Sequence, residues 1–346
     1  MRTLSTLLLC LTVLSHAFAQ DKLAQAKPQG SDDWGYIDVS GKFVIDAQYR
    51  NCHAFSEGYA PIYDKKAKTF YFIKPDGSKL DTDVEKFKLK NIFGFGTKGF
   101  SSGLAAIQVG KKWGYLNTEG KLVIEAKYDK AHPFDQKSAS VKSGDSFLII
   151  NRSGTETSID ASGVEDLKAF SENMAPVKIN GLWGFVDATG KVVVEATYKG
   201  VGQMSQGLAW VKNEAGKVGF IDATGKLAID DQFDAAKDFT DGLARVKKND
   251  TWMYVDLKGN TISPASADSY GKFSDGLAYA KKDGKVGFIG KDGKWVIEPK
   301  FDKVRDFSNG LAAVRIGEKW GFIAANGKYA IEPQFEAVKD FENLGK

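Results

Sequence analysis

The sequence contains few of the residues from which catalytic centres, metal sites and disulfide frameworks are built. Two cysteines and three histidines occur in 346 residues, and Cys10 and His16 lie in the first 20 of them. The remaining cysteine, Cys52, cannot form an internal disulfide. We expect its thiol to be a small buried group rather than a nucleophile, and we expect His53 and His132 to be partly buried residues of connecting segments.

Familiar catalytic motifs are also scarce. The sequence has no H-E-x-x-H, no C-x-x-C pair and no phosphate loop. Single aspartates recur at one position of a repeated segment, but calcium needs about six oxygen ligands or more. We therefore interpret these aspartates as turn residues and expect no catalytic residue, no cofactor and no metal site. The aspartates in question are Asp38, Asp187, Asp222 and Asp256.

A strong excess of charge of one sign is lacking as well, since the sequence has 48 basic and 44 acidic residues. This balance argues against a nucleic-acid partner, which requires a concentrated basic field.

The first 19 residues combine Arg2, an apolar run from Leu4 to Leu14 and the small residues Ala17 and Ala19. They are typical of a secretory signal cleaved after Ala19. No later stretch is long and apolar enough to span a bilayer, so we expect an exported mature protein without a membrane span, in the periplasm, on the outer surface or outside the cell.

What the sequence has in abundance is repetition. Short segments of the type Trp-Gly-Phe/Tyr-Ile-Asp recur with a spacing of about 34 residues, which indicates a tandem-repeat architecture. The spacing widens where residues 84–99 are inserted, and the segments beginning at Phe70 and Phe147 match the pattern only partly. The first residues of the segments are Trp34, Phe70, Trp113, Phe147, Trp183, Val218, Trp252, Val286 and Trp320.

Each unit is interpreted as a three-stranded antiparallel meander. The Trp-Gly segment forms strand A, a turn of the Asp-x-x-Gly type follows, and an apolar β-branched triplet such as Val192–Val194 forms strand B. A Gly-Leu-Ala-x-Val-Lys segment forms strand C and leads by a tight turn, such as Asn180-Gly181, into the next strand A. Between strands B and C lies a linker with two aromatic residues six apart, which fits a helical turn or an irregular segment equally well.

The chain ends bear on how the units assemble. Residues 20–33 are polar and aperiodic, so we expect a flexible N-terminal lead, followed by a repeat domain over residues 34–346. About nine A–B hairpins but eight C strands can be counted, and neither terminus offers the missing strand. A closed ring often completes one sheet with strands from both termini, so an open array or spiral is favoured over a closed ring. The fold class is all-β in either case.

The pattern Trp-Gly-Phe/Tyr-Ile-Asp-x-x-Gly-Lys-x-Val-Ile, followed by Phe-Ser-x-Gly-Leu-Ala-x-Val-Lys, resembles the WG repeat, also called KWG. The resemblance covers residues 34–341. Members of that family are mostly bacterial, often exported, and generally lack an assigned activity. The resemblance therefore implies a β-repeat protein and transfers no catalytic residue to this chain.

One position of the unit is free to vary, namely the third residue of Leu-Ala-x-Val, called position x below. In three consecutive units it holds Trp210, Arg245 and Tyr279. Aromatic residues and arginine dominate binding hot spots, so these three form a candidate binding strip. We expect a non-catalytic binding or scaffold protein whose partner is another envelope or extracellular protein. The alternative is a module that binds a carbohydrate or cell-wall polymer.

Overall fold

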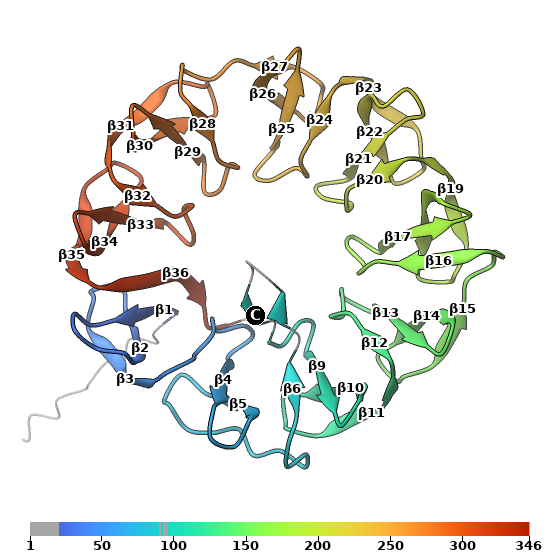
Figure 1. The fold of residues 1–346 in the computed structure, drawn as a ribbon, viewed down its shortest axis with the longest axis horizontal. Helices are drawn as coiled ribbons and strands as arrows, with labels where there is room; N and C mark the ends of the chain where they lie inside the picture. Colours follow the sequence, from blue (N-terminus) through green and yellow to red (C-terminus); the bar gives the residue numbers. More distant parts are fainter. Residues whose placement is uncertain (1–20, 90, 93–95, 98, 346) are drawn as a thin grey trace, which may run out of the picture.

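The computed structural model describes residues 21–89, 91–92, 96–97 and 99–345. The predicted signal segment, residues 1–19, lies outside this part of the chain. The described residues form β-sheets arranged around a ring, with the C-terminus inside it (Figure 1). A helix long and apolar enough to cross a membrane is not found among them. The predicted all-β tandem-repeat fold is confirmed.

Eight of the nine units have one strand more than predicted, and the unit beginning near Phe70 has only two strands. Eight sheets contain four antiparallel strands, and the added strand is the linker, which pairs with strand C. The order in a sheet is therefore linker–C–A–B, with strand B on the outer side of the ring (Figure 1). The linker strand can be as short as Ala235–Ala236. Two residues show no recognisable alternation of polar and apolar side chains, so the sequence did not predict this strand. We call each sheet a blade and number the blades along the chain.

The first five blades are built as follows. Blade 1 contains β36 (Ala337–Asn343), β1 (Lys22–Lys27), β2 (Trp34–Ile37) and β3 (Phe43–Tyr49); blade 2 contains β4 (Ala60–Asp64) and β5 (Thr69–Ile73). Blade 3 contains β6 (Lys88–Leu89), β9 (Leu104–Val109), β10 (Lys112–Asn117) and β11 (Leu122–Tyr128). Blade 4 contains β12 (Lys130–Ala131), β13 (Ser138–Ser143), β14 (Ser146–Asn151) and β15 (Glu156–Ser158). Blade 5 contains β16 (Val164–Leu167), β17 (Met174–Ile179), β18 (Leu182–Asp187) and β19 (Val192–Tyr198).

The remaining four blades repeat this plan, and the inserted segment adds a small hairpin. Blade 6 contains β20 (Gly200–Val201), β21 (Leu208–Lys212), β22 (Val218–Asp222) and β23 (Leu227–Phe233). Blade 7 contains β24 (Ala235–Ala236), β25 (Leu243–Lys248), β26 (Thr251–Asp256) and β27 (Thr261–Ile262). Blade 8 contains β28 (Ser269–Tyr270), β29 (Leu277–Lys282), β30 (Lys285–Gly290) and β31 (Trp295–Phe301). Blade 9 contains β32 (Lys303–Val304), β33 (Leu311–Ile316), β34 (Lys319–Ala324) and β35 (Tyr329–Phe335), and the inserted hairpin consists of β7 (Asn91–Ile92) and β8 (Gly96–Thr97).

The Trp-Gly motif is explained by a bulge between strands A and B. In blade 3, Trp113 pairs with Tyr128 and Tyr115 with Ile124, so strand B has two extra residues opposite Gly114. A Cβ at Gly114 would lie 2.4 Å from the carbonyl oxygen of Ile124, which is closer than real Cβ atoms come. Glycine is therefore required wherever strand B crosses strand A so closely.

The predicted turns are confirmed. The Asp187 carboxylate accepts hydrogen bonds from the backbone N–H and the hydroxyl of Thr189, and Gly190 closes the turn with a φ of 85°. Asn180 and Gly181 connect strands C and A with φ values of 48° and 86°. Both central residues thus lie in the left-handed region that a tight hairpin of this kind demands.

Buried apolar side chains fill the space between neighbouring blades. Phe220 and Ile229 of blade 6, for example, pack against Ala244 and Val255 of blade 7. Clusters of this kind lie between each pair of successive blades, including blades 9 and 1. A single blade buries little on its own, so the core of this protein is modular and is formed by neighbours.

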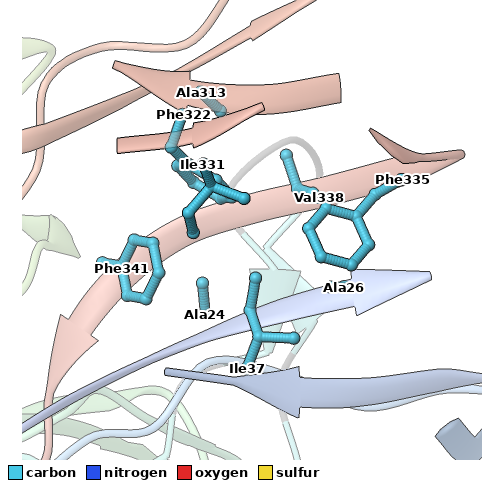
Figure 2. Close-up of a cluster of buried hydrophobic side chains, with 9 residues drawn as sticks. All are labelled: Ala24, Ala26, Ile37, Ala313, Phe322, Ile331, Phe335, Val338 and Phe341. Atoms are coloured by element: carbon cyan, nitrogen blue, oxygen red, sulfur yellow. The ribbon is translucent and has the colours of Figure 1, made fainter. Parts of the chain in front are cut away.

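The two chain ends meet in one sheet, and this differs from the flexible lead and the open array that the sequence favoured. Strand β1, from residues expected to be flexible, pairs with β2 on one side and with β36 on the other. Figure 2 shows the result: Ala24, Ala26 and Ile37 of blade 1 pack with Phe341 and with side chains of blade 9. The array is therefore a closed ring of separate sheets, the β-propeller architecture.

The missing C strand was present in the sequence in altered form. Residues Leu23 to Lys27 read Leu-Ala-Gln-Ala-Lys, which matches Leu-Ala-x-Val-Lys with alanine in place of valine. Strand β1 is thus the C strand of blade 1, and β36 supplies the linker strand of that blade. Lys27 Nζ strengthens the contact between the chain ends through an ion pair of 2.6 Å with Glu336.

Candidate binding site

In seven of the blades, one position of the linker faces one position of strand C. Position x lies on strand C, and its carbonyl oxygen accepts a hydrogen bond from the backbone N–H of a linker residue, which we call position y. The donor–acceptor distances are 2.9 Å for Gly202 to Trp210, 2.9 Å for Lys237 to Arg245 and 2.8 Å for Gly271 to Tyr279. The same bond recurs from His53, His132, Lys168 and Arg305.

These positions contribute to the wall of a cavity of about 960 Å³. The cavity follows the linker segments of blades 7, 8, 9, 1 and 2, on the side of each sheet that faces the middle of the ring (Figure 1). Its volume lies at the upper end of the range of about 300–1,000 Å³ that small-molecule sites occupy. The basic residues of the wall are Arg50, Lys237, Arg245, Lys272, Arg305 and Lys339. The acidic residues of the wall are Asp238, Asp306, Asp340 and Glu342.

The residues of the candidate strip lie at equivalent positions of blades 6, 7 and 8. All three side chains are half-buried rather than exposed on an outer surface. Arg245 and Tyr279 line the cavity, whereas Trp210 is not among its wall residues. The structure therefore brings two of the three into one concave site, and their role in binding stays a prediction.

The two aromatic residues of the strip require glycine at position y. A Cβ at Gly202 would lie 2.4 Å from Trp210 Nε1, and a Cβ at Gly271 would lie 2.3 Å from Tyr279 Cδ1. Both rings therefore occupy the space that a side chain at position y would take. The size of the residue at position x thus dictates the size of its partner at position y.

Arg245 is held in place by two contacts and keeps one donor free of protein partners. Its guanidinium lies 5.1 Å from the ring centre of Trp252, and its Nη1 donates to the carbonyl oxygen of Tyr270. Its Nε is buried and has no hydrogen-bond partner in the described part of the protein. A buried donor without a partner costs about 1–3 kcal/mol.

An acidic group lies on the same cavity wall. Asp306 Oδ1 is buried and lacks a hydrogen-bond partner among the described residues, while Oδ2 lies 4.0 Å from Lys272 Nζ. Burial raises the pKa of Asp306, against the lowering effect of Lys272 and, more weakly, of Arg245. The opposite charges of Arg245 and Asp306 therefore act on one another, and each leaves one polar atom unsatisfied.

Strand β36 supplies a second charged group. Arg305 makes a bidentate ion pair with Asp340, with distances of 2.5 Å from Nε and 2.8 Å from Nη2. Burial raises the pKa of Glu342 to about 7, and the charge of Asp340 adds to this shift. Burial, followed by the charge of Arg305, lowers the pKa of Lys339. Burial in this part of the wall therefore disfavours the charged forms of Glu342 and Lys339.

Comparison with known proteins gives the family. The WG containing repeat matches residues 34–65, 113–145, 149–183, 183–217, 219–252, 252–285, 287–320 and 320–346. The chain belongs to the WG-repeat family. The matched segments leave out residues 66–112, where the unit beginning near Phe70 and the insertion lie.

This WG-repeat protein is similar to several solved structures at low sequence identity. A crystal structure of a eukaryotic initiation factor aligns over 94% of this chain and 98% of its own, with 12% identity and a TM-score of 0.62. The computationally designed Ika8 protein covers 78% and 96% at 14% identity and a TM-score of 0.44. BamB from Moraxella catarrhalis covers 80% and 94% at 10% identity and a TM-score of 0.43. A search of curated proteins finds no match.

The cysteine and the two histidines of the described residues are buried or partly buried. Cys52 is buried, burial raises the pKa of its thiol, and Gln25 Nε2 donates to its carbonyl oxygen at 2.6 Å. His53 and His132 are partly buried, as predicted, and burial lowers the pKa of His53 to about 4. Within the described ranges, no three His, Cys, Asp or Glu side chains are grouped so as to hold a metal ion.

The stretch Gly99 to Gly103 spells Gly-x-Ser-x-Gly, a pattern also found around catalytic serines. Here the Ser101 hydroxyl donates to the carbonyl oxygen of Phe134 in the next unit at 2.8 Å. Ser205 and Ser308 make the equivalent bond to the units that follow them. The serine is therefore a contact between successive WG repeats.

The linker residues of the cavity were not identified from the sequence, although a signal exists. A basic residue, an aspartate and a phenylalanine recur in the linkers of three units, and each trio begins at position y. That these linkers meet at one cavity wall follows only from the closed ring. The three stretches are Lys237-Asp238-Phe239, Arg305-Asp306-Phe307 and Lys339-Asp340-Phe341.

Proposed function

We propose that this WG-repeat protein is an exported, non-catalytic scaffold whose central cavity binds another protein of the cell envelope or the extracellular space. The observation that supports this most is where variation falls in the repeat. Turn, bulge and core residues recur from unit to unit, whereas positions x and y change in size and charge. In blades 7, 8, 9, 1 and 2 at least one of these varied positions lines the same cavity, so a ring of constant framework carries a wall of varied side chains.

Capture of partners from envelope extract tests the proposal. The bait is the chain from residue 20 onward, and the test variant is Lys272→Glu, which reverses an exposed charge on the cavity wall. Lys226→Glu, an exposed turn residue outside the cavity, is the matched control. We expect a specific protein to be retained by wild type and by the control and to be lost from the test variant. Retention by all three, or by none, contradicts the proposal.

Export is tested separately. The charged start, short apolar run and small residues before Gln20 support a cleaved signal. N-terminal sequencing of the protein from its native cell should give Gln20 as the first residue, in an extracytoplasmic fraction. Recovery of the uncleaved chain from the cytoplasm would contradict this part of the proposal.

A further inference from the structure

Two residues of the cavity wall each have a polar atom, one a donor and the other an acceptor, that is buried and lacks a partner within the described protein. These atoms are Arg245 Nε and Asp306 Oδ1. Buried polar groups are normally hydrogen-bonded, so each exception calls for an explanation. Arg315 Nε is a third such atom, but Arg315 is not part of the wall.

Charged ligand groups fit this pair poorly. A carboxylate or phosphate could accept from Arg245 Nε–H, but it would be repelled by Asp306 on the same wall. An ammonium group could donate to Asp306 Oδ1, but Arg245 and Lys272 would repel it. A hydroxyl group fits both, because it carries one O–H donor and two acceptor lone pairs.

The rest of the wall has the composition of a site for hydroxylated rings. It contains both basic and acidic side chains, such as Lys237 next to Asp238 in the chain, so the wall does not carry charge of one sign only. Tyr279 and Trp34 add half-buried aromatic rings. Aromatic surface together with a few placed polar groups is the usual make-up of small-molecule sites. Trp252 is not a wall residue, but its ring centre lies 5.1 Å from the Arg245 guanidinium and helps to hold it.

We propose that the cavity is a saccharide-binding site in which sugar hydroxyls accept from Arg245 Nε–H and donate to Asp306 Oδ1. The inference rests on the proposed binding function of this cavity and names the chemistry recognised there. The saccharide has two possible sources, a free polysaccharide and a glycan carried by the protein partner. Both present the same hydroxyl groups to the site.

Direct titration tests the chemistry. Chitohexaose, cellohexaose and maltoheptaose are titrated into the purified chain from residue 20 onward by calorimetry. We expect at least one to bind, and Arg245→Lys or Asp306→Ala to weaken it about tenfold or more, as loss of a hydrogen bond to a charged group does. Arg315→Lys removes the unpartnered Nε that lies outside the cavity, and it should bind as wild type does. Thermal unfolding of each variant confirms that it is folded.

Two results of the titration overturn the inference. One is that none of the three oligosaccharides binds; the other is that Arg245→Lys and Asp306→Ala bind as tightly as Arg315→Lys. The source is identified by repeating the envelope capture after enzymatic deglycosylation of the extract. Loss of the captured protein identifies a protein-borne glycan, and persistence with release by the bound oligosaccharide identifies a free polysaccharide. Capture that depends on Lys272 but resists both treatments overturns the inference and leaves the proposed function standing.

Discussion

Closure of the ring can be tested by a covalent link between the two chain ends. Ala26 of β1 and Val338 of β36 are directly opposite one another in the antiparallel ladder, and both side chains belong to the cluster between blades 9 and 1 (Figure 2). Directly opposed residues have Cα atoms about 4.5–5.5 Å apart, which lies within the range that a disulfide spans. Ala26→Cys together with Val338→Cys should therefore form an intramolecular disulfide.

The effect on stability should be large because the link closes nearly the whole chain. For a loop of about 310 residues, the loss of chain entropy in the unfolded state corresponds to about 6 kcal/mol. Engineered disulfides deliver less than this, so we expect about 2–4 kcal/mol. The substitutions are made in the chain from residue 20 onward together with Cys52→Ala, which removes the one other cysteine of that segment.

Mobility on a non-reducing gel and thermal unfolding with and without reductant provide the assay. Ala26→Cys with Val304→Cys is the control, because Val304 occupies the place of Val338 in the preceding linker strand, where it pairs with Val314. An open array would hold residues 26 and 338 at opposite ends of the molecule. Disulfide-linked dimers in place of a monomeric cross-link, or a cross-link as frequent in the control, would refute the closed ring.

Three further substitutions test particular contacts. Gly271→Ala should cost about 1–3 kcal/mol of overpacking against the Tyr279 ring, and adding Tyr279→Ala should recover most of it in denaturant unfolding; equal losses in both backgrounds would disprove the contact. Glu342→Gln should raise the melting temperature at pH 8 more than at pH 5. The pKa of Glu342 is about 7 in the folded protein, which is higher than in the unfolded chain. The ionised carboxylate therefore destabilises the fold above pH 7, and this penalty disappears as the pH falls. An equal shift at both pH values would contradict it. Ser205→Ala removes the 2.8 Å bond to the Phe239 carbonyl oxygen of the next unit and should cost about 1 kcal/mol by thermal unfolding, whereas no change would show that this bond does not couple the units.

Local chemistry made much of the unit predictable. The hairpin at Asn180-Gly181 and the turn closed by Gly190 follow from residues that tolerate a positive φ. The close approach of strand B to Gly114 is possible because a glycine inside an apolar strand has no side chain to intervene. These features depend on residues near one another in the sequence, and such short-range rules recur in every unit.

The features that were missed depend on partners far away in the chain. Strand β1 has polar Gln25 at its centre and alanine where other units have valine, and its neighbour β36 lies more than 300 residues away. Likewise, position x was found from its variation, but Asp306 and the other linker charges were not, because only the closed ring brings five linkers to one cavity.

Ring closure and the candidate site are therefore coupled. Lys339, Asp340 and Glu342 of β36 form part of the cavity wall, and β36 is held in blade 1 by its ladder with β1. Asp340 in turn holds Arg305 of blade 9 through the bidentate ion pair. The wall is complete only after the two chain ends have paired, so a ligand of the cavity must bind the closed ring better than any opened form. By linkage, such a ligand stabilises closure by its differential affinity, and the Cys-linked ring should bind it at least as tightly as wild type.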